Sequence, residues 1–344
     1  MTSFDKYDTM EIGTKGGRLM EGTVSWSQIR TWTTCRQKWY WLYRVGIVPK
    51  RMRRAPSIGS CGHVALAAVT AGTDWEAAVD AWLQEELAKP MFDEEVEEYH
   101  KVADLVRGII PRYVAHYQDT FEPVVVERRF NIPVSGVKTR LVGYWDAIVK
   151  DRDGKLWLKE NKMPQHGFRT YEDLILDGQI GVYQWAARRS GFPVVGTIFD
   201  QLLAKLPAEP SVNKDGSLSR AKVYTDWGTY KARLLERGLD PANYAEMEDK
   251  LSGFEFFKRD YIYRPPSEVK QFTEGMQQKV WELSATRKRI YRCDSFINCS
   301  GCDYRELCIE QAKGRDVQDL IEMSFEPRQP RKEEQKDDDE TTTA

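Results

Sequence analysis

The sequence contains no long hydrophobic run. None of its apolar stretches approaches the ~18 residues that a membrane-spanning helix needs, so no membrane association is expected. The first ten residues carry two aspartates and lack the apolar segment typical of a secretion signal. A cytoplasmic protein is the resulting expectation.

Cysteine is scarce and unevenly placed. Six cysteines in a chain without a secretion signal are not expected to form a disulfide framework. Cys35 and Cys61 lie near the start, and four more fall within sixteen residues near the end: Cys293, Cys299, Cys302 and Cys308. Clustered cysteines of an intracellular protein are typical metal ligands.

A large excess of one charge is also missing. The formal net charge is −2, but residues 331–344 alone carry −3, which leaves the rest of the chain at +1. Basic clusters at 50–54 and 287–292 could follow a phosphate backbone, although solvated surface explains them equally well. The apolar fraction of 41% excludes a wholly disordered chain, and the length suggests about two domains.

Helical periodicity dominates the first third of the chain. We expect helices over about 26–43, 58–69, 74–88 and 93–118, the first beginning after a capping pattern at Ser25 and Gln28. An apolar stripe puts Cys35 on a buried face of the first helix. Pro111 should kink the fourth.

The period then changes to that of strands. Segments 123–134, 138–150 and 155–162 are separated by turn signals and predict a three-stranded meander. A helix over 172–190 precedes a strand over 194–203, which allows the third and fourth strands to pair in parallel. A short helix near 227–237 and a last helix over 267–290 follow.

Composition divides the chain into six parts. They are a mobile N-terminus (1–22), a helical region (23–120), an α/β core (121–204), an insertion rich in Pro, Gly, Asn and charge (205–260), a C-terminal helix with the cysteine loop (261–325) and a disordered acidic tail (326–344).

The main chemical signal is a pair of acids beside a lysine. Asp146 lies on the second strand, while Glu160 and Lys162 end the third, where their two-residue spacing points both to one face. Buried charges are costly unless they are paired or bind a metal. Two converging carboxylates suit Mg²⁺ or Mn²⁺, and a nearby lysine can orient an attacking water. A simple Glu–Lys ion pair explains the same pattern equally well.

Further polar residues can join this group. Gln179 and Tyr183 are four apart on the helix after the third strand and share a face. His63 follows small residues that permit close approach, although a lone histidine is more often structural. Glu127, on the first strand, can assist a metal, but an exposed strand charge is the simpler interpretation.

The C-terminal cysteines leave two ligand sets open. Three thiolates come from the run Cys299-x2-Cys302-x5-Cys308. A local fourth ligand, Cys293, would complete a structural zinc site. A distant one, Cys35, would complete an iron–sulfur cluster that joins the two ends of the chain. Thiolates serve both metals, so residue chemistry alone does not decide.

Six motifs occur in a characteristic order: a cysteine-bearing helix, Gly-x3-His, Gly-x2-Asp, Glu-x-Lys, Gln-x3-Tyr and Cys-x2-Cys-x5-Cys. In this order the chain resembles the RecB-like branch of the PD-(D/E)XK nuclease superfamily over about 25–312. It is similar in particular to the iron–sulfur members: AddB-type nuclease domains, CRISPR-associated Cas-four-type exonucleases and their phage relatives. The fold implied is a restriction-endonuclease-like α/β core with a mixed central sheet.

The resemblance also implies a function and a site. It implies a metal-dependent DNA exonuclease that prefers single-stranded ends, in recombination, repair or phage DNA processing, with recombination or replication proteins as candidate partners. The implied Mg²⁺ or Mn²⁺ ligands are His63, Asp146, Glu160 and the Asn161 carbonyl. Lys162 would be the catalytic lysine, with Gln179 and Tyr183 supporting the site and contacting DNA.

The resemblance favours a [4Fe-4S] cluster over zinc. Its implied ligands are Cys35, Cys299, Cys302 and Cys308, which leaves Cys61 and Cys293 as spare thiols. The insertion at 205–260 has no counterpart with a transferable role, and we expect it to guide the DNA strand. A structure-specific endonuclease on the same core and an inactive zinc-containing DNA-binding protein are the alternatives.

Overall fold

The computed structural model describes residues 22–50, 57–221, 224–285 and 290–329. The expected mobile N-terminus and most of the acidic tail therefore lie outside the described residues. So do most members of the two basic clusters and one insertion lysine: Arg51, Arg53, Arg54, Lys222, Arg287, Lys288 and Arg289.

The first part of the chain is mainly helical. Its elements are β1 (Thr23–Ser25), α1 (Trp26–Thr34), α2 (Arg36–Trp39), the π-helix η1 (Tyr40–Val45), β2 (Ile47–Pro49), α3 (Ile58–Ala71), α4 (Trp75–Leu87) and α5 (Asp93–Tyr117). The helices expected over 58–69, 74–88 and 93–118 are present, and α5 continues through Pro111.

The second part alternates strands and helices. Its elements are β3 (Glu122–Pro133), β4 (Arg140–Lys150), β5 (Leu156–Lys162), α6 (Tyr171–Ile175), α7 (Gly178–Arg189), β6 (Gly196–Leu202), α8 (Trp227–Glu236), the 3₁₀-helix η2 (Pro241–Tyr244), α9 (Ala245–Leu251) and β7 (Phe257–Tyr263). The last elements are α10 (Pro266–Ala285), α11 (Phe296–Ser300), α12 (Arg305–Ala312), α13 (Gln318–Ser324) and β8 (Phe325–Pro327).

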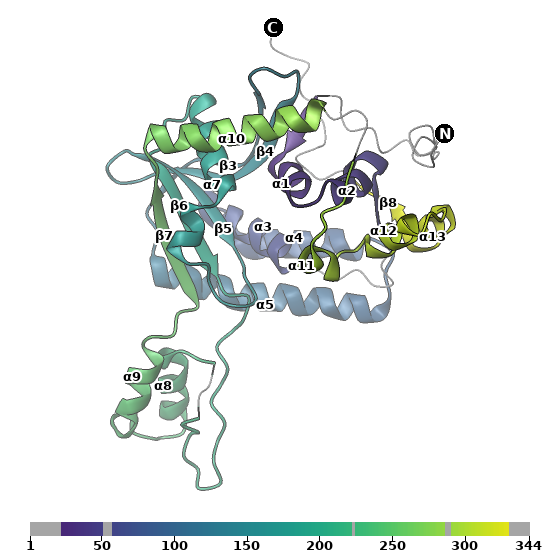
Figure 1. The fold of residues 1–344 in the computed structure, drawn as a ribbon. Coiled ribbons are helices and arrows are strands. Elements are labelled where there is room, and N and C mark those ends of the chain that lie inside the picture. The colour runs from purple at the N-terminus through teal and green to yellow at the C-terminus, as the bar shows by residue number, and fades with distance from the viewer. Residues whose placement is uncertain (1–21, 51–56, 222–223, 286–289, 330–344) are drawn as a thin grey trace.

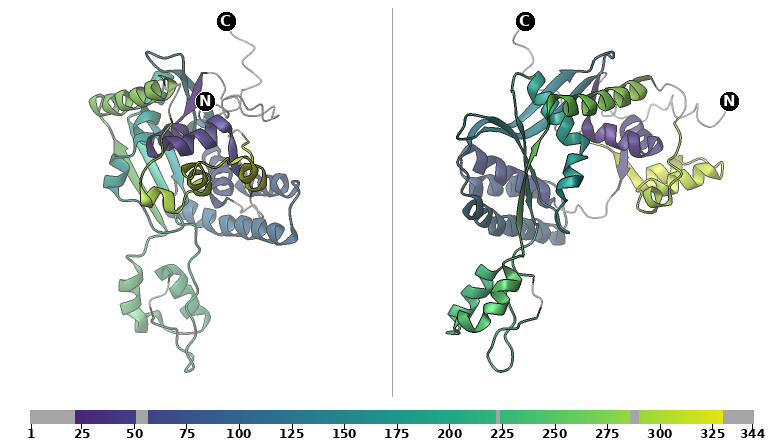
Figure 2. Two further views of the ribbon diagram at one scale, coloured as in Figure 1. Left: turned by 45° about the vertical axis from the view of Figure 1, so that its right-hand side comes forward. Right: turned by 60° about the vertical axis from the view of Figure 1, so that its left-hand side comes forward.

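Six described strands form one mixed sheet in the order β1-β4-β5-β6-β7, with β3 on the other edge of β4. The meander β3-β4-β5 is antiparallel and β5 pairs with β6 in parallel, as predicted. Helices α3, α4 and α5 lie on one side of the sheet and α7 and α10 on the other (Figure 2, right). The expected α/β class with a mixed central sheet is confirmed.

One edge of β4 is shared by two partners. β1 pairs with residues 140–142 in parallel, and β5 pairs with 147–150 in antiparallel. Residues 143–146 lie between these two ladders, so this stretch of the edge has neither strand beside it. Asp146 lies at the end of the gap, next to the point where β5 leaves β4.

Near Asp146, the side chains of the β3–β4 hairpin stop alternating regularly between the two faces of the sheet. On β4, Trp145 and Ile148 belong to one apolar cluster, whereas Ala147 belongs to another. Strict alternation would put Trp145 with Ala147. On β3, Glu127 has a φ of +46°, which is uncommon for a residue other than glycine. The hairpin is therefore kinked where Glu127 and Asp146 lie, a feature that the simple alternation had not predicted.

The first predicted helix is divided in the structure. Ser25 caps α1 by accepting a hydrogen bond from the Gln28 N–H at 3.3 Å, as expected. At Cys35, however, the backbone is extended, with φ −158° and ψ 114°, and α2 begins only after it. The prediction of one helix over 26–43 was wrong here, because helical periodicity does not register a single extended residue between two helical segments.

The insertion forms a separate small body (bottom of Figure 1). Helices α8 and α9 and the loop before them enclose their own apolar cluster, which includes Leu218, Tyr230 and Met247. The insertion was predicted to extend to 260, but its last residues belong to β7, which pairs with β6 along 196–202. This strand was not predicted because its first residues, FKRD, are largely charged like the insertion before them.

The two ends of the described chain meet in a second, two-stranded sheet. β2 pairs with β8 in antiparallel, and the Tyr304 hydroxyl donates a hydrogen bond to the Ile47 carbonyl at 2.7 Å. We call residues 35–50 and 290–329 the cysteine module. The tail was expected to be disordered from Glu326, but the structure pairs Glu326 and Pro327 with β2. No helix of the described residues is long and apolar enough to cross a membrane.

Candidate active site

Asp146 is held at the gap in the edge of β4 by the backbone of β5. Its Oδ2 accepts a hydrogen bond from the Asn161 N–H at 2.8 Å. The side chain thus takes the position of a ladder acceptor just where the two strands separate. Asn161 is buried and lies on β5 between Glu160 and Lys162. Its backbone hydrogen bond therefore holds Asp146 close to these two residues.

His63 and Glu127 converge on the same carboxylate. The Nδ1 of His63 lies 3.5 Å from Asp146 Oδ2. One ligand atom from each of His63, Glu127 and Asp146 falls within 4.8 Å of the others, and all three residues are partly exposed. One imidazole and two carboxylates at this spacing make a donor set that can hold a divalent cation.

The close approach of α3 depends on a glycine. Gly62 is buried, and a methyl group added to it would overlap the Sδ of Met163, which follows β5 directly. The small residue therefore allows α3 to bring the neighbouring His63 onto the sheet. This explains the glycine directly before His63 in the sequence.

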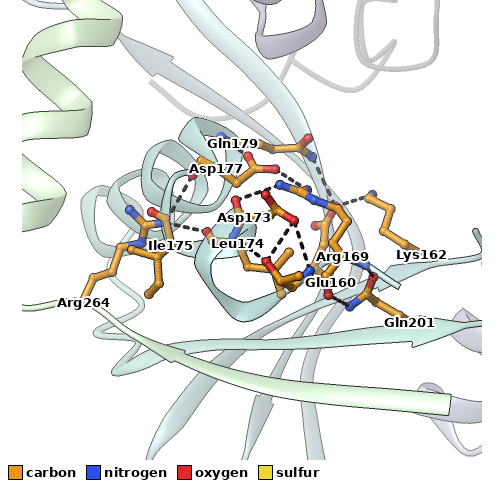
Figure 3. A network of polar contacts seen from close by, with 11 residues as sticks. Glu160, Lys162, Arg169, Asp173, Leu174, Ile175, Asp177, Gln179, Gln201 and Arg264 are labelled. Atoms are coloured by element: carbon orange, nitrogen blue, oxygen red, sulfur yellow. Dashed lines mark hydrogen bonds and ion pairs between the residues drawn. The ribbon is translucent and has the colours of Figure 1, made fainter. Parts of the chain in front are cut away.

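Glu160 and Lys162 form a second polar group beside the first. Lys162 Nζ lies 2.5 Å from Glu160 Oε1, and the same oxygen accepts a hydrogen bond from Gln179 Nε2 at 3.2 Å (Figure 3). Glu160 is buried, whereas the Lys162 side chain is 42% exposed. The predicted strand-end face is therefore present: Leu156 and Leu158 pack in the apolar cluster below these two charges.

The two groups influence each other electrostatically. Burial raises the pKa of Glu160, Lys162 opposes the shift, and the negative charge of Asp146 adds to it. Burial alone would lower the pKa of Lys162, but the charges of Glu160 and Asp146 outweigh it and raise that pKa. Lys162 is accordingly an ammonium group at neutral pH, suited to hold a water or a phosphate oxygen.

A hydrogen-bonded corner between α6 and α7 positions Gln179. Asp177 caps α7 by accepting from the Gln179 N–H at 2.7 Å, and Arg169 Nη1 donates to Asp177 Oδ2 at 2.6 Å. Arg264 Nη2 donates to the carbonyls of Leu174 and Ile175 from the other side (Figure 3). This corner fixes the first turn of α7 against the end of β5.

Tyr183 lies one turn further along α7. Its ring packs edge-on against Phe130 at a centroid distance of 5.2 Å, and its hydroxyl lies over Gly143. A side chain at Gly143 would meet both rings, at 2.5 Å from Phe130 Cζ and 3.0 Å from the Tyr183 oxygen. The glycine of the Gly-x2-Asp motif thus makes room for the tyrosine of the Gln-x3-Tyr motif.

Glu160, Lys162, Gln179 and Tyr183 line one cavity of about 340 Å³, whereas His63, Glu127 and Asp146 lie outside its lining. Its lining includes residues that the sequence analysis named and others that it did not: Arg30, Leu158, Glu160, Lys162, Met163, Pro164, Arg169, Asp177, Gln179, Ile180, Tyr183, Thr197, Phe199 and Gln201. Arg30 comes from α1, far away in the sequence.

Sequence reasoning missed two features of this site. It named Glu127 but preferred an exposed strand charge, whereas the structure places Glu127 beside His63 and Asp146. It did not name Arg169 or Arg264, because nothing in the sequence signals that a guanidinium will bind carbonyls at a distant helix corner. Glu160, expected in one group with His63 and Asp146, contacts Lys162 and Gln179, and the charges of Asp146 and His63 act on its pKa.

The cysteine module brings five cysteines to one cavity of about 770 Å³. They are Cys35, Cys293, Cys299, Cys302 and Cys308, and Lys38, Arg292 and Arg305 lie around them. The predicted proximity of Cys35 to the C-terminal trio is present, although Cys293 lines the cavity too. Cys61 is fully buried in the cluster around α3 and α5, away from the other five.

Burial raises the pKa of two of these thiols, Cys302 and Cys308. Burial raises the pKa of Cys308 to about 11, and the charges of Cys302, Cys35 and Cys299 add to the shift. The pKa of Cys302 is raised by burial and then by Cys35. A metal centre binds cysteine as the thiolate, so binding would offset the raised pKa of Cys302 and Cys308.

Comparisons with known proteins point to one family. The model of the PD-(D/E)XK nuclease superfamily matches residues 23–309. Two solved structures resemble the chain: SSO0001, with 11% identity, a TM-score of 0.34 and coverage of 88% of this chain and 92% of that one, and a candidate exonuclease from Eubacterium rectale, with 8% identity, a TM-score of 0.41 and coverage of 82% and 88%. The comparison with curated proteins found no match.

Proposed function

The chain belongs to the PD-(D/E)XK nuclease superfamily, and on this premise we propose that it is a metal-dependent DNA exonuclease that acts on single-stranded ends. The observation that carries the proposal is the convergence of His63, Glu127 and Asp146 close to Glu160 and Lys162, two residues that line a cavity. A metal-ligand group next to an ammonium and an open cavity suits phosphodiester hydrolysis.

The donor atoms fit a small divalent cation. Carboxylate oxygens suit Mg²⁺ and Mn²⁺, and an imidazole is a common further ligand. We propose His63, Asp146 and Glu127 as side-chain ligands, and we keep Glu160 and the Asn161 carbonyl as further candidates. When bound, such an ion lowers the pKa of a water molecule and neutralises charge on the phosphate.

The remaining polar residues have roles that follow from their contacts. Lys162 points its ammonium group into the cavity, where it can orient the attacking water or hold a phosphate oxygen. Glu160 holds Lys162, and Gln179 holds Glu160 from α7. Tyr183 also lines the cavity, one turn further along α7. Together Glu160 and Gln179 hold the lysine in place.

The cysteine module suits a [4Fe-4S] cluster. We propose Cys35, Cys299, Cys302 and Cys308 as its ligands, because all four line one cavity and the charges of Cys35, Cys299 and Cys302 act on the Cys308 thiol. Fe–S clusters are held by four such thiolates. Cys35 ends α1 and the trio lies in residues 299–308, so the cluster would join the first helices to the last described helices. Its role would be structural.

The substrate is proposed to be DNA with a free single-stranded end, in recombination, repair or phage DNA processing. Clusters of basic and aromatic residues contact phosphates and bases without reading sequence. A preference for an end instead of a sequence is the expected behaviour.

The test compares end-labelled linear DNA with closed circular single-stranded DNA, in Mg²⁺, in Mn²⁺ and in a chelator. We expect linear single strands to be shortened from an end only when metal is present, and circles to remain intact. Asp146→Asn should abolish cleavage and keep the melting temperature of the wild type. Lys101→Ala, at an exposed position of α5, is the matched control and should cleave normally.

The other outcomes distinguish the alternatives. Cleavage of circles would indicate a structure-specific endonuclease. Binding without cleavage in either metal, together with zinc in the purified protein, would indicate a DNA-binding protein that has lost catalysis. Full activity of Asp146→Asn would contradict the proposed metal site.

A further inference from the structure

The side chains that line the active-site cavity carry more positive than negative charges. Three cations line it, Arg30, Lys162 and Arg169, but only two anions, Glu160 and Asp177. Lys162 pairs with Glu160 and Arg169 pairs with Asp177 (Figure 3). One positive charge is left over, and it belongs to Arg30.

The guanidinium of Arg30 has no partner within the described part of the chain. Its residue is exposed, and α1 carries no acidic residue to which it could turn. An arginine that lines a cavity without a carboxylate beside it retains all five N–H donors for a ligand. A planar guanidinium matches a phosphate through two parallel hydrogen bonds.

The position of Arg30 is set by packing one turn earlier on α1. Trp26 and Arg30 are four residues apart and therefore share a face of the helix. Trp26 lies against Gly178, where an added methyl group would come within 2.5 Å of its ring. Gly178 begins α7, whose next residue, Gln179, holds Glu160. Two helices distant in sequence are thus locked together at the cavity.

We propose that Arg30 binds a phosphate group of the DNA strand next to the one that is cut. The inference rests on the proposed nuclease function and adds a substrate-binding residue to it. Lys162 and the metal ligands serve the phosphate that reacts, while Arg30 enters the cavity from another element with its charge uncommitted. A contact to a phosphate that does not react strengthens substrate binding without changing the chemical step.

Binding is tested first without chemistry. Wild type, Arg30→Ala, Arg30→Lys and the control Lys101→Ala are titrated with a fluorescent single-stranded oligonucleotide in chelator at several salt concentrations. Arg30→Ala should bind about tenfold more weakly at low salt, and the slope of log affinity against log salt should fall by about 0.7, as for one lost phosphate contact. Arg30→Lys should keep the slope and lose part of the affinity, because it keeps the charge but not the fork.

Kinetics then locate the contact. With Mg²⁺ or Mn²⁺, Arg30→Ala should raise KM about tenfold and leave kcat near that of the wild type. An unchanged affinity, salt slope and KM in a folded Arg30→Ala protein would overturn the proposal. A tenfold loss of kcat at unchanged KM would overturn it as well, since the contact would then be to the reacting phosphate.

The two proposals fail in different ways. A wild-type protein that binds the oligonucleotide but cuts no DNA in either metal overturns the nuclease function, while the binding comparison still decides the role of Arg30. A wild-type protein that cuts DNA, with Arg30→Ala equal to it in every measurement, overturns the role of Arg30 alone.

Discussion

The backbone N–H of Cys293 donates a hydrogen bond to the Sγ of Cys35, 3.4 Å away, although 258 residues separate them. The contact brings both candidate fourth ligands to the same cavity. It involves the main chain of Cys293 and the side chain of Cys35, so the two cysteines have unequal roles. Removing the Cys293 side chain would preserve it, whereas removing the Cys35 side chain would not.

This difference makes the cluster testable with single substitutions. The purified protein should be brown, with broad visible absorbance, and Cys35→Ala should lose both the colour and several degrees of melting temperature, because metal binding is part of folding in such centres. Cys293→Ala should keep most of the colour. Cys61→Ala is the matched control outside the cavity, where burial raises the pKa of the thiol to about 12 and makes it a poor ligand.

Metal analysis of anaerobically purified protein decides between iron and zinc. A colourless protein that contains zinc, loses it on Cys293→Ala and is unaffected by Cys35→Ala would contradict the cluster and favour the local zinc site.

Gly62→Ala should disturb the active site without unfolding the protein. The new methyl group would overlap the Sδ of Met163, a flexible side chain that lines the catalytic cavity and must move. We expect about a tenfold loss of kcat with a change of only a few degrees in melting temperature. The double variant Gly62→Ala/Met163→Ala should recover part of the activity, because the smaller side chain leaves room. Full activity of Gly62→Ala would contradict the conclusion that α3 needs a glycine at this position to approach the sheet.

Stability should fall at acid pH partly through Asp119. Burial alone would raise the pKa of this carboxyl, but hydrogen bonds from Arg259 and the charge of Lys159 outweigh it and lower the pKa. A lowered pKa stabilises the fold at pH values above the unfolded-state pKa of ~3.9, and the contribution is lost as the pH falls through the folded-state value. Asp119→Asn should cost about 1–3 kcal/mol at pH 7 and much less at pH 3.

Thermal unfolding between pH 3 and 7 measures this difference. Asp104→Asn, at an exposed position of α5 where the carboxylate also pairs with an arginine, is the control and should change little at any pH. Equal destabilisation by Asp119→Asn at pH 3 and pH 7 would mean that its charge is not what stabilises the fold.

The insertion should contribute to DNA binding through lysines and not arginines. Arg220 pairs with Glu246 at 2.6 Å, and Arg233 pairs with Glu236 at 2.8 Å, so their charges are locally neutralised. Lys214 and Lys231 have no ion-pair partner among the described residues. Replacing both lysines by alanine should weaken DNA binding severalfold at low salt, with less loss as salt rises.

The matched control replaces Arg220 and Arg233 by alanine in the same body. It should affect affinity less than the lysine pair, measured by titration of the same oligonucleotide. Unchanged affinity of the lysine variant at low salt would exclude the insertion from the DNA path.

The elements of the sheet could be predicted from local patterns, because alternation and turn residues act over a few neighbours. The strands over 123–134, 138–150 and 155–162 and the parallel pairing of the next strand were confirmed. The phase change at Glu127 and Asp146 could not be predicted, since it depends on a positive φ and on two partners that divide one strand edge. For the same reason, Glu127 was expected to be an exposed strand charge and not a neighbour of His63 and Asp146.

The site was predictable where the motifs lie on regular elements. Lys162, Glu160 and Gln179 were expected on adjacent elements, and the structure brings them into contact. Arg30 was not predicted, because its position depends on the packing of Trp26 against Gly178, a contact between residues about 150 positions apart. Long-range packing of this kind leaves no local trace in the sequence.

The pairing of β2 with β8 sets an order of events during synthesis. Residues 47–49 leave the ribosome before their partner strand at 325–327, and about 275 residues are synthesised in between. At about 5–20 residues per second, the delay is roughly a quarter of a minute to a minute. The sheet and its helices can fold in that time, while the cysteine module, which includes Cys35, still lacks strand β8. A ribosome that stops before residue 325 would therefore release a chain with its catalytic residues made and its cysteine module open.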